Sequence, residues 1–249
     1  MALRGVMSPE GLAESRHGGV RIWRDADAAA QARTLATAIA AELRAALALR
    51  SHASLVVSGG RSPAAMFAVL ATQSLPWERV VVTLADERWV GVDDPASNER
   101  LVRTTLLRDA AAGARLVGMK NDAATPQAGA VAAWQALGAL PRPFDVMVLG
   151  MGDDGHTASL FPGSAELAAG LDTDAAPGVL GVQPPVAPHA RLSLNLAALL
   201  DSRRICLQIS GAAKWAVYER AANGGAVAEL PVSAVLLQRQ VPVDVYWCP

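Results

Sequence analysis

Short apolar runs alternate with alanine-rich, amphipathic segments along most of the 249-residue chain. Runs of valine, isoleucine and leucine that are bounded by glycine, proline or charged residues are typical of strands buried on both faces. The pattern predicts strands at residues 20–23, 54–60, 79–87, 114–119, 144–152, 178–183, 191–196, 203–210 and 243–248. Because helical segments separate most of these strands, the sequence predicts an α/β fold with a doubly wound, mainly parallel sheet and helices on both faces.

Capping residues mark where the expected helices begin. Serine, aspartate and asparagine favour the N-cap because their side chains accept a hydrogen bond from a free backbone N–H. The sequence predicts N-caps at Asp25 or Asp27, Ser62, Ser97, Asn195 and Ser210. Pro63 stands directly after Ser62, at the first helical position, where its missing N–H has no cost. The segments that follow these caps, together with residues 126–140 and 233–238, are predicted to be helical.

The chain is expected to form one domain with a short arm. Residues 1–18 show no periodic pattern and are predicted to be a flexible arm, and residues 19–249 are predicted to form a single α/β domain. The segment 172–188 is rich in proline, glycine and aspartate, and is expected to be a long surface excursion. The sequence leaves open whether this excursion closes over a site.

Composition favours an intracellular globular protein over several other classes. Hydrophobic residues make up 52% of the sequence, and the net charge of -1 gives no bulk attraction to nucleic acids or anionic membranes. Cys206 and Cys248 lie in apolar runs, which indicates buried thiols rather than a disulfide. The first residues of the sequence have no apolar core of signal-peptide length, and no stretch reaches the 18 uninterrupted apolar residues of a membrane span. We expect a cytoplasmic protein without nucleic-acid or membrane partners, either a monomer or a homodimer.

Glycines and charged residues follow several of the predicted strands. In open α/β sheets, ligands bind beyond the carboxyl ends of the strands. A glycine loop at the start of a helix lets backbone N–H groups approach a phosphate, and a cation in a first helical turn is better tolerated when an anion also binds there. The candidates for such contacts are Ser58, Gly59, Gly60, Arg61, Asp86, Arg88, Arg191 and Lys214. An ordinary turn and surface salt bridges remain the competing interpretations.

The stretch GMGDDGH at residues 150–156 fits the spacing of a dinucleotide-binding loop, but its chemistry argues against one. Two adjacent carboxylates would repel a pyrophosphate strongly. Asp154 and His156 instead have the spacing of a general base, in which a carboxylate fixes the imidazole tautomer and leaves the other nitrogen free. A purely structural hydrogen bond is the alternative. Metal binding is not expected, since the remaining histidines, His17, His52 and His189, are scattered.

Four blocks of sequence, in order, resemble the 6-phosphogluconolactonase family. They are VVSGGRSP, TLADERWVGVDDPASNERLVRTTLL, FDVMVLGMGDDGHTASLFPGS and RLSLNLAALLDSRRICLQISGAAKW. The resemblance extends from about Val20 to Trp247. It implies the fold of the glucosamine-6-phosphate isomerase and deaminase superfamily, and hydrolysis of 6-phospho-D-glucono-1,5-lactone to 6-phosphogluconate in the oxidative pentose phosphate pathway. It implies no metal and no organic cofactor, and a phosphosugar lactone as the small-molecule partner.

The resemblance also implies roles for individual residues. His156 matches the general base of the family, and we expect Asp154 to orient it. Arg88, Lys214 and the loop Ser58–Arg61 match positions that bind phosphate and substrate, and the block containing Arg191 is matched as well. Arg88 or loop N–H groups would then hold the oxyanion. Which of the cations meets the phosphate, and which meets the lactone carbonyl, stays open.

Two other functions compete with lactone hydrolysis. In glucosamine-6-phosphate deaminases the block with the histidine continues into a glutamate, whereas here HTASLFPGS has no carboxylate before Glu166. Asp86 matches the carbon-acid base of those deaminases, so that residue alone does not separate the two enzymes. A sugar-phosphate sensor that has lost catalysis is the third possibility, and the presence of every polar group that the chemistry needs argues against it.

Overall fold

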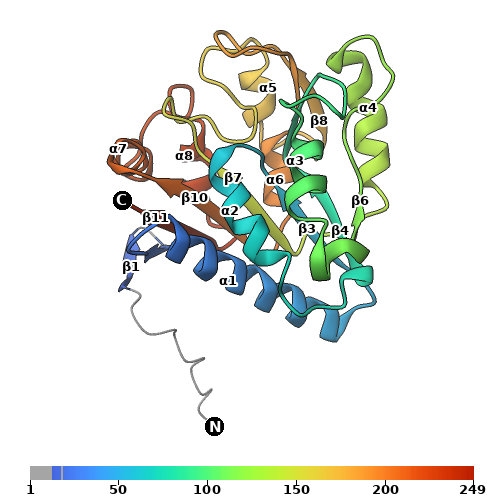
Figure 1. Cartoon of the computed structure of the whole chain (residues 1–249). Coiled ribbons are helices and arrows are strands. Elements are labelled where there is room, and N and C mark those ends of the chain that lie inside the picture. The colour runs from blue at the N-terminus through green and yellow to red at the C-terminus, as the bar shows by residue number, and fades with distance from the viewer. Residues whose placement is uncertain (1–12, 18) are drawn as a thin grey trace.

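Two β-sheets organise the chain (Figure 1). The structure, a computed structural model, describes residues 13–17 and 19–249, and for residues 13–17 and Arg61 it describes the backbone alone. The larger sheet has the order β1 (Ala13–His17), β2 (Val20–Arg24), β11 (Val243–Cys248), β10 (Ile205–Ser210), β7 (Val146–Gly150), β3 (Ala53–Val57), β4 (Val80–Leu84) and β6 (Arg115–Leu116). The smaller sheet has the order β5 (Asp86–Arg88), β9 (Arg191–Leu194) and β8 (Val179–Val182).

The larger sheet is parallel except at one edge. All of its neighbouring strands pair in parallel apart from β1 and β2, which are antiparallel. Successive strands run outward from β3 through β4 to β6, and the chain then returns to β7 on the other side of β3. Strand order therefore reverses between β3 and β7, which is where such sheets bind ligands.

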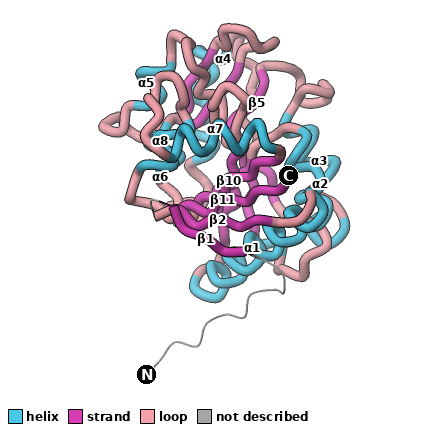
Figure 2. The backbone as a smooth tube through the Cα atoms, turned by 90° about the vertical axis from the view of Figure 1, so that its left-hand side faces the viewer, coloured by secondary structure: helices cyan, strands magenta, loops and turns pink. Residues whose placement is uncertain are grey.

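Helices cover both faces of this sheet (Figure 2). The helices are α1 (Ala28–Leu49), α2 (Arg61–Leu70), α3 (Asn98–Thr105), α4 (Pro126–Leu137), α5 (Leu167–Leu171), α6 (Leu196–Leu200), α7 (Ala212–Ala222) and α8 (Val232–Leu237), with short 3-10 turns at Trp77–Arg79 and Asp109–Gly113. Figures 1 and 2 show α1 and α2 on one face and α6 and α8 on the other. The predicted fold, a doubly wound and mainly parallel α/β sheet, is confirmed.

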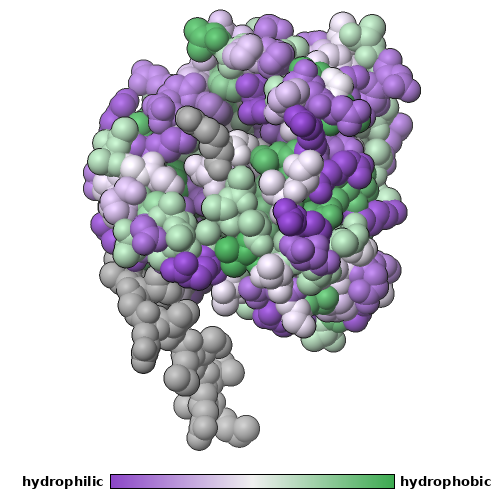
Figure 3. Space-filling model, in the orientation of Figure 1, coloured by the Kyte–Doolittle hydropathy of each residue, from purple (hydrophilic) through white to green (hydrophobic). Residues whose placement is uncertain are grey.

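One contiguous hydrophobic core fills the space between these layers. It extends from Val20 on β2 to Tyr246 on β11, and strands β3 and β4 are buried along their whole length. Cys206 and Cys248 are both buried and free. None of the helices in the described residues is long and apolar enough to cross a bilayer. On the face shown in Figure 3, hydrophilic residues are spread widely, with hydrophobic residues among them, mainly toward the centre.

The predicted N-caps divide into two groups. Asp27, Ser97 and Asn195 accept hydrogen bonds from the third backbone N–H after them, as expected. The predictions of Ser62 and Ser210 are wrong. Gly60 and Gly211 are the N-caps of α2 and α7, with φ of 113° and 88°. Only glycine adopts such angles easily. Helix α2 therefore begins two residues earlier than predicted, at Arg61, and α7 begins one residue later, at Ala212.

Three segments differ from the expected elements. The apolar run 79–87 does not form one strand, because Ala85 donates its N–H to Val57 in the larger sheet and accepts from Leu194 in the smaller one. The excursion 172–188 contains β8, which pairs with β9. In the predicted arm, Ala13–His17 pair with β2 as a strand rather than lying free, whereas residues 1–12 and 18 lie outside the described residues.

Candidate active site

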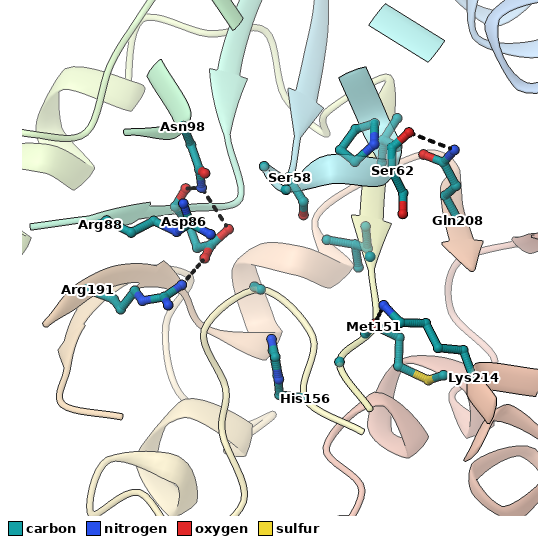
Figure 4. Close-up of a pocket in the computed structure, with 18 residues that line it drawn as sticks. Ser58, Ser62, Asp86, Arg88, Asn98, Met151, His156, Arg191, Gln208 and Lys214 are labelled. Carbon is teal, nitrogen blue, oxygen red and sulfur yellow. Dashed lines mark hydrogen bonds and ion pairs between the residues drawn. The ribbon is translucent and has the colours of Figure 1, made fainter. Parts of the chain in front are cut away.

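A cavity of about 210 Å³ opens beyond the carboxyl ends of β3 and β7, at the point where strand order reverses. Two groups of polar side chains face each other across it (Figure 4). Asp86, Arg88, Asn98 and Arg191 gather on one side, Ser62, Gln208 and Lys214 lie on the other, and His156 points in between them. The cavity is therefore polar at both ends, with an imidazole between the ends.

His156 is held by a local hydrogen bond to Asp154. Its Nδ1 lies 2.6 Å from Oδ1 of Asp154, which also accepts the backbone N–H of His156 at 3.2 Å. Burial alone would raise the pKa of the Asp154 carboxyl, but the hydrogen bond and charge of His156 outweigh burial and hold that pKa below its ordinary value. Within the described residues Nε2 of His156 has no protein partner, so this nitrogen is available to a ligand or a water molecule.

Glycine is required at position 152 for this pair to form. A Cβ atom on Gly152 would lie 2.1 Å from Nδ1 of His156 and 2.4 Å from Oδ1 of Asp154. The turn is closed by a hydrogen bond of 2.9 Å from the N–H of Gly152 to the carbonyl of His156. The glycines of GMGDDGH thus shape a tight turn around the imidazole.

The loop after β3 and the start of α7 form one end of the cavity. No side chain that the structure describes caps α2, so the first N–H groups of this helix are open to a ligand beside the cavity. A Cβ on Gly59 would lie 1.7 Å from Oδ1 of Asn98, which shows how closely this loop approaches the neighbouring wall. Across from it, Nζ of Lys214 donates to the carbonyl of Met151 at 2.6 Å. Free N–H groups and an ammonium at one end of a cavity favour an anion.

Two arginines and a buried carboxylate form the other end. Arg88 and Arg191 stand directly opposite each other in the pairing of β5 with β9. Nη1 of Arg191 lies 3.7 Å from Oδ2 of Asp86, which also accepts the Ser159 hydroxyl at 2.6 Å. Burial lowers the pKa of the Arg191 guanidinium; Asp86 opposes this effect, and Arg88 adds to it. Like charges opposite each other on paired strands repel. An anionic ligand group bound here, in addition to Asp86, would reduce the repulsion between Arg88 and Arg191.

Several polar atoms at this cavity have no partner within the described residues. Each is buried and belongs to a residue that lines the cavity: Ser58 Oγ, Arg88 Nε, Asn98 Oδ1, Arg191 Nε and Gln208 Oε1. Buried polar atoms are nearly always hydrogen-bonded in native structures. Their concentration here indicates that a polar ligand completes the site.

The chain is similar to known proteins of one family. Residues 26–247 match the family model of glucosamine-6-phosphate isomerases and 6-phosphogluconolactonase. The chain belongs to this family. A 6-phosphogluconolactonase from Pseudomonas putida is 46% identical over 230 residues, covering 92% of this chain and 93% of that protein. One from Pseudomonas aeruginosa is 42% identical over 249 residues, covering 100% of both. A crystal structure of a 6-phosphogluconolactonase from Shewanella baltica has a TM-score of 0.89 at 46% identity, covering 92% and 97% of the two chains.

Most of the site residues that the sequence predicts lie together in the structure. Those that line the cavity are Ser58, Gly59, Gly60, Asp86, Arg88, His156, Arg191 and Lys214. Asp154 does not line the cavity and reaches it only through its hydrogen bond to His156. Arg61 is the first residue of α2, and its side chain lies outside the described part of the chain. In the part that is described, no group of three or more His, Cys, Asp or Glu side chains is arranged to hold a metal ion.

Asn98 and Gln208 are site residues that the sequence analysis missed. Asn98 donates from Nδ2 to the carbonyl of Asp86 at 2.8 Å. Gln208 donates from Nε2 to Oε1 of Gln31 at 2.9 Å, and Gln31 in turn donates to two backbone carbonyls. The available signal was a glutamine in the middle of the apolar strand ICLQIS, since a buried polar residue needs a partner.

Glu87 supports this wall without entering the cavity. Its carboxylate accepts the N–H groups of Arg88, Asn98 and Glu99 and the hydroxyl of Ser97, at 2.7–3.1 Å. Glu87 is only 1% exposed, and burial raises the pKa of its carboxyl although these N–H groups oppose that shift. The side chain thereby fixes the start of α3, and with it Asn98.

We expect Glu87→Gln to lower the free energy of unfolding by about 2 kcal/mol, because one amide NH2 group would face donors that now share two oxygens. Urea denaturation of the variant and the wild type measures the change. Glu219→Gln is the matched control, since Glu219 is exposed on α7 and we expect its replacement to shift stability by less than about 0.5 kcal/mol. Equal stability of the Glu87 variant and the wild type would contradict this account of α3.

Asp154→Asn should lower kcat by about 100-fold or more while the protein stays folded, because an amide can stabilise the wrong tautomer of His156 and cannot balance its positive charge. Steady-state kinetics measure the effect. Asp153→Asn is the control, because Asp153 is exposed in the same turn and does not line the cavity. Equal losses in both variants would remove Asp154 from the role of orienting the base.

Proposed function

We propose that this protein hydrolyses 6-phospho-D-glucono-1,5-lactone to 6-phospho-D-gluconate in the oxidative pentose phosphate pathway, with His156 as the general base. The observation that carries the proposal is the Asp154–His156 pair, whose free Nε2 faces a cavity with cations at both ends. The names of the related lactonases support the same substrate. The buried, unpaired cysteines fit the cytoplasm, where we place the protein.

The two ends of the cavity suit the two ends of this substrate. The α2 N-terminus with Gly59 and Gly60, together with Lys214, would bind the phosphate. Arg88 and Arg191 would face the lactone carbonyl, because they lie on the opposite wall. Binding the distant phosphate then positions the carbonyl next to His156, so that the attack becomes effectively intramolecular.

The reaction follows from these positions. Nε2 of His156 takes a proton from water while the water oxygen attacks the carbonyl carbon. The carbonyl oxygen becomes an oxyanion, which the guanidinium groups of Arg88 and Arg191 stabilise. When the oxyanion collapses, the bond from the carbonyl carbon to the ring oxygen breaks, and the imidazolium returns its proton to that oxygen. The products are a hydroxyl group and a carboxylic acid, which then ionises.

The surroundings of Asp86 and His156 favour lactone hydrolysis over deamination. Asp86 is 5% exposed, and its carboxylate is occupied by Ser159, Arg191 and a longer contact of 3.4 Å to Asn98. A carboxylate held in this way is poorly placed to remove a proton from carbon. Asp154 is the carboxylate that contacts the imidazole of His156 within the described residues.

One assay with two arms tests the proposal. Freshly prepared 6-phosphogluconolactone is supplied, and acid release is followed above the spontaneous rate of hydrolysis. Glucosamine 6-phosphate is supplied in parallel, and ammonia is measured. We expect acid release in the first arm and no ammonia in the second. Ammonia without lactone hydrolysis would favour the deaminase, and no product above background in either arm would favour a sensor.

A further inference from the structure

Phe161 lies against two of the charged groups on which the proposed reaction depends. Its ring centroid is 4.2 Å from that of His156, at an interplanar angle of 34°. The guanidinium carbon of Arg191 lies 5.4 Å from the centroid of the same ring. One aromatic side chain therefore contacts both the imidazole and an arginine of the opposite wall.

Phe161 is a buried hydrophobic residue that lies beside the contiguous core. Phe161 is 4% exposed, yet it does not belong to the contiguous core, whereas its neighbour Leu160 does. Its ring packs at a tilt against the imidazole of His156 and lies beneath the guanidinium of Arg191.

The hydrogen bond to Asp154 alone does not fix the imidazole. Nδ1 of His156 is its single hydrogen-bonded ring atom within the described residues, so the ring could pivot about that bond. A second contact is needed to aim Nε2 at one point in the cavity. The ring of Phe161 supplies this contact from a distance at which aromatic pairs pack favourably.

The same ring suits the charge that appears during the reaction. When His156 takes a proton, it becomes a cation in a cavity that already contains Arg88 and Arg191. The negative face of an aromatic ring attracts cations that lie within about 6 Å of its centroid. Phe161 can therefore stabilise the guanidinium before the proton transfer and both cations after it, without adding a titratable group.

We propose that Phe161 is a positioning residue, which holds the imidazole of His156 and the guanidinium of Arg191 against one aromatic ring. The base and the oxyanion donor then keep a fixed distance and orientation relative to each other. This inference rests on the proposed role of His156. Phe161 does not line the cavity and need not touch the substrate.

The test compares Phe161→Leu with Phe161→Tyr, which keeps the ring. We expect Phe161→Leu to lower kcat by about tenfold or more with KM within about twofold, because small displacements of a catalytic group cost large factors in rate. We expect Phe161→Tyr to stay within about threefold of the wild type. Phe144→Leu is the control. Phe144 is also buried, and the guanidinium carbon of Arg142 lies 5.0 Å from its ring centroid. Phe144 stands before β7, at the end of that strand away from the cavity.

An NMR signature distinguishes positioning from simple packing. In the wild type and in Phe161→Tyr, the ring protons of His156 should show a ring-current shift and nuclear Overhauser contacts to residue 161, and in Phe161→Leu the ring-current shift should be lost. The wild-type spectrum alone supports or overturns the contact, even if the leucine variant does not fold. A kcat of Phe161→Leu within twofold of the wild type, or equal losses in the leucine and tyrosine variants, would overturn the proposal. Wild-type turnover that depends on His156 tests the proposed function separately.

Discussion

Replacing His156 by alanine should lower kcat for the phosphorylated lactone by about 100- to 10,000-fold, the range that general-base catalysis typically contributes. KM should change little, because alanine removes neither the arginines nor the loop after β3. The lactone also hydrolyses spontaneously, so turnover must be measured above that background in a rapid, coupled assay. Added imidazole should restore part of the activity if the missing group is a base rather than a structural element.

His52→Ala provides the matched control for this variant. His52 is exposed just before β3, at the end of the sheet opposite to the cavity. Its replacement should leave kcat and KM unchanged. If the folded His156 variant kept a kcat within tenfold of the wild type, His156 would not be the base, and the family relationship of the chain would stand without this mechanism.

Local chemistry explains why the contact between Asp154 and His156 could be predicted from the sequence. Asp154 and His156 are two residues apart in a glycine turn, so their hydrogen bond depends on few other parts of the chain. The same holds for the N-caps Asp27, Ser97 and Asn195, each of which bonds three residues ahead. The fold class was predictable because buried parallel strands and their crossover helices leave a periodic pattern.

The features that the sequence analysis missed depend on distant partners. The break at Ala85 is set by Val57 and Leu194, which lie in different sheets. Nε2 of Gln208 donates to Gln31 on α1, a contact that spans 177 positions in the sequence. Ser62 and Ser210 had good capping chemistry, but the glycine before each helix already turned the chain. Local capping propensity does not decide which residue becomes the N-cap, because the tertiary arrangement determines where the chain leaves the strand and enters the helix.

Phe161 illustrates the same limit at the site itself. In the sequence it stands beside Leu160 in an apolar pair, where either residue would be assigned to the core. Only the fold shows that Leu160 enters the core while Phe161 meets His156 and Arg191. Residue type and spacing therefore indicated the contact between Asp154 and His156, whereas the contacts of Phe161 with His156 and Arg191 depend on tertiary packing.

Lys214→Met should raise KM for 6-phosphogluconolactone by about 10- to 100-fold, which is the loss expected when a hydrogen bond to a charged group is removed. Methionine keeps most of the length of the side chain and removes the charge. KM for unphosphorylated glucono-1,5-lactone should stay within about twofold, because that substrate presents no phosphate to the α2 end of the cavity. Lys120→Met is the matched control: Lys120 is the other lysine of the sequence, and it packs on Trp89 at 4.0 Å without lining the cavity. An equal rise in KM for both lactones would place Lys214 at the lactone ring rather than at the phosphate, and the two ends of the site would have to be reassigned.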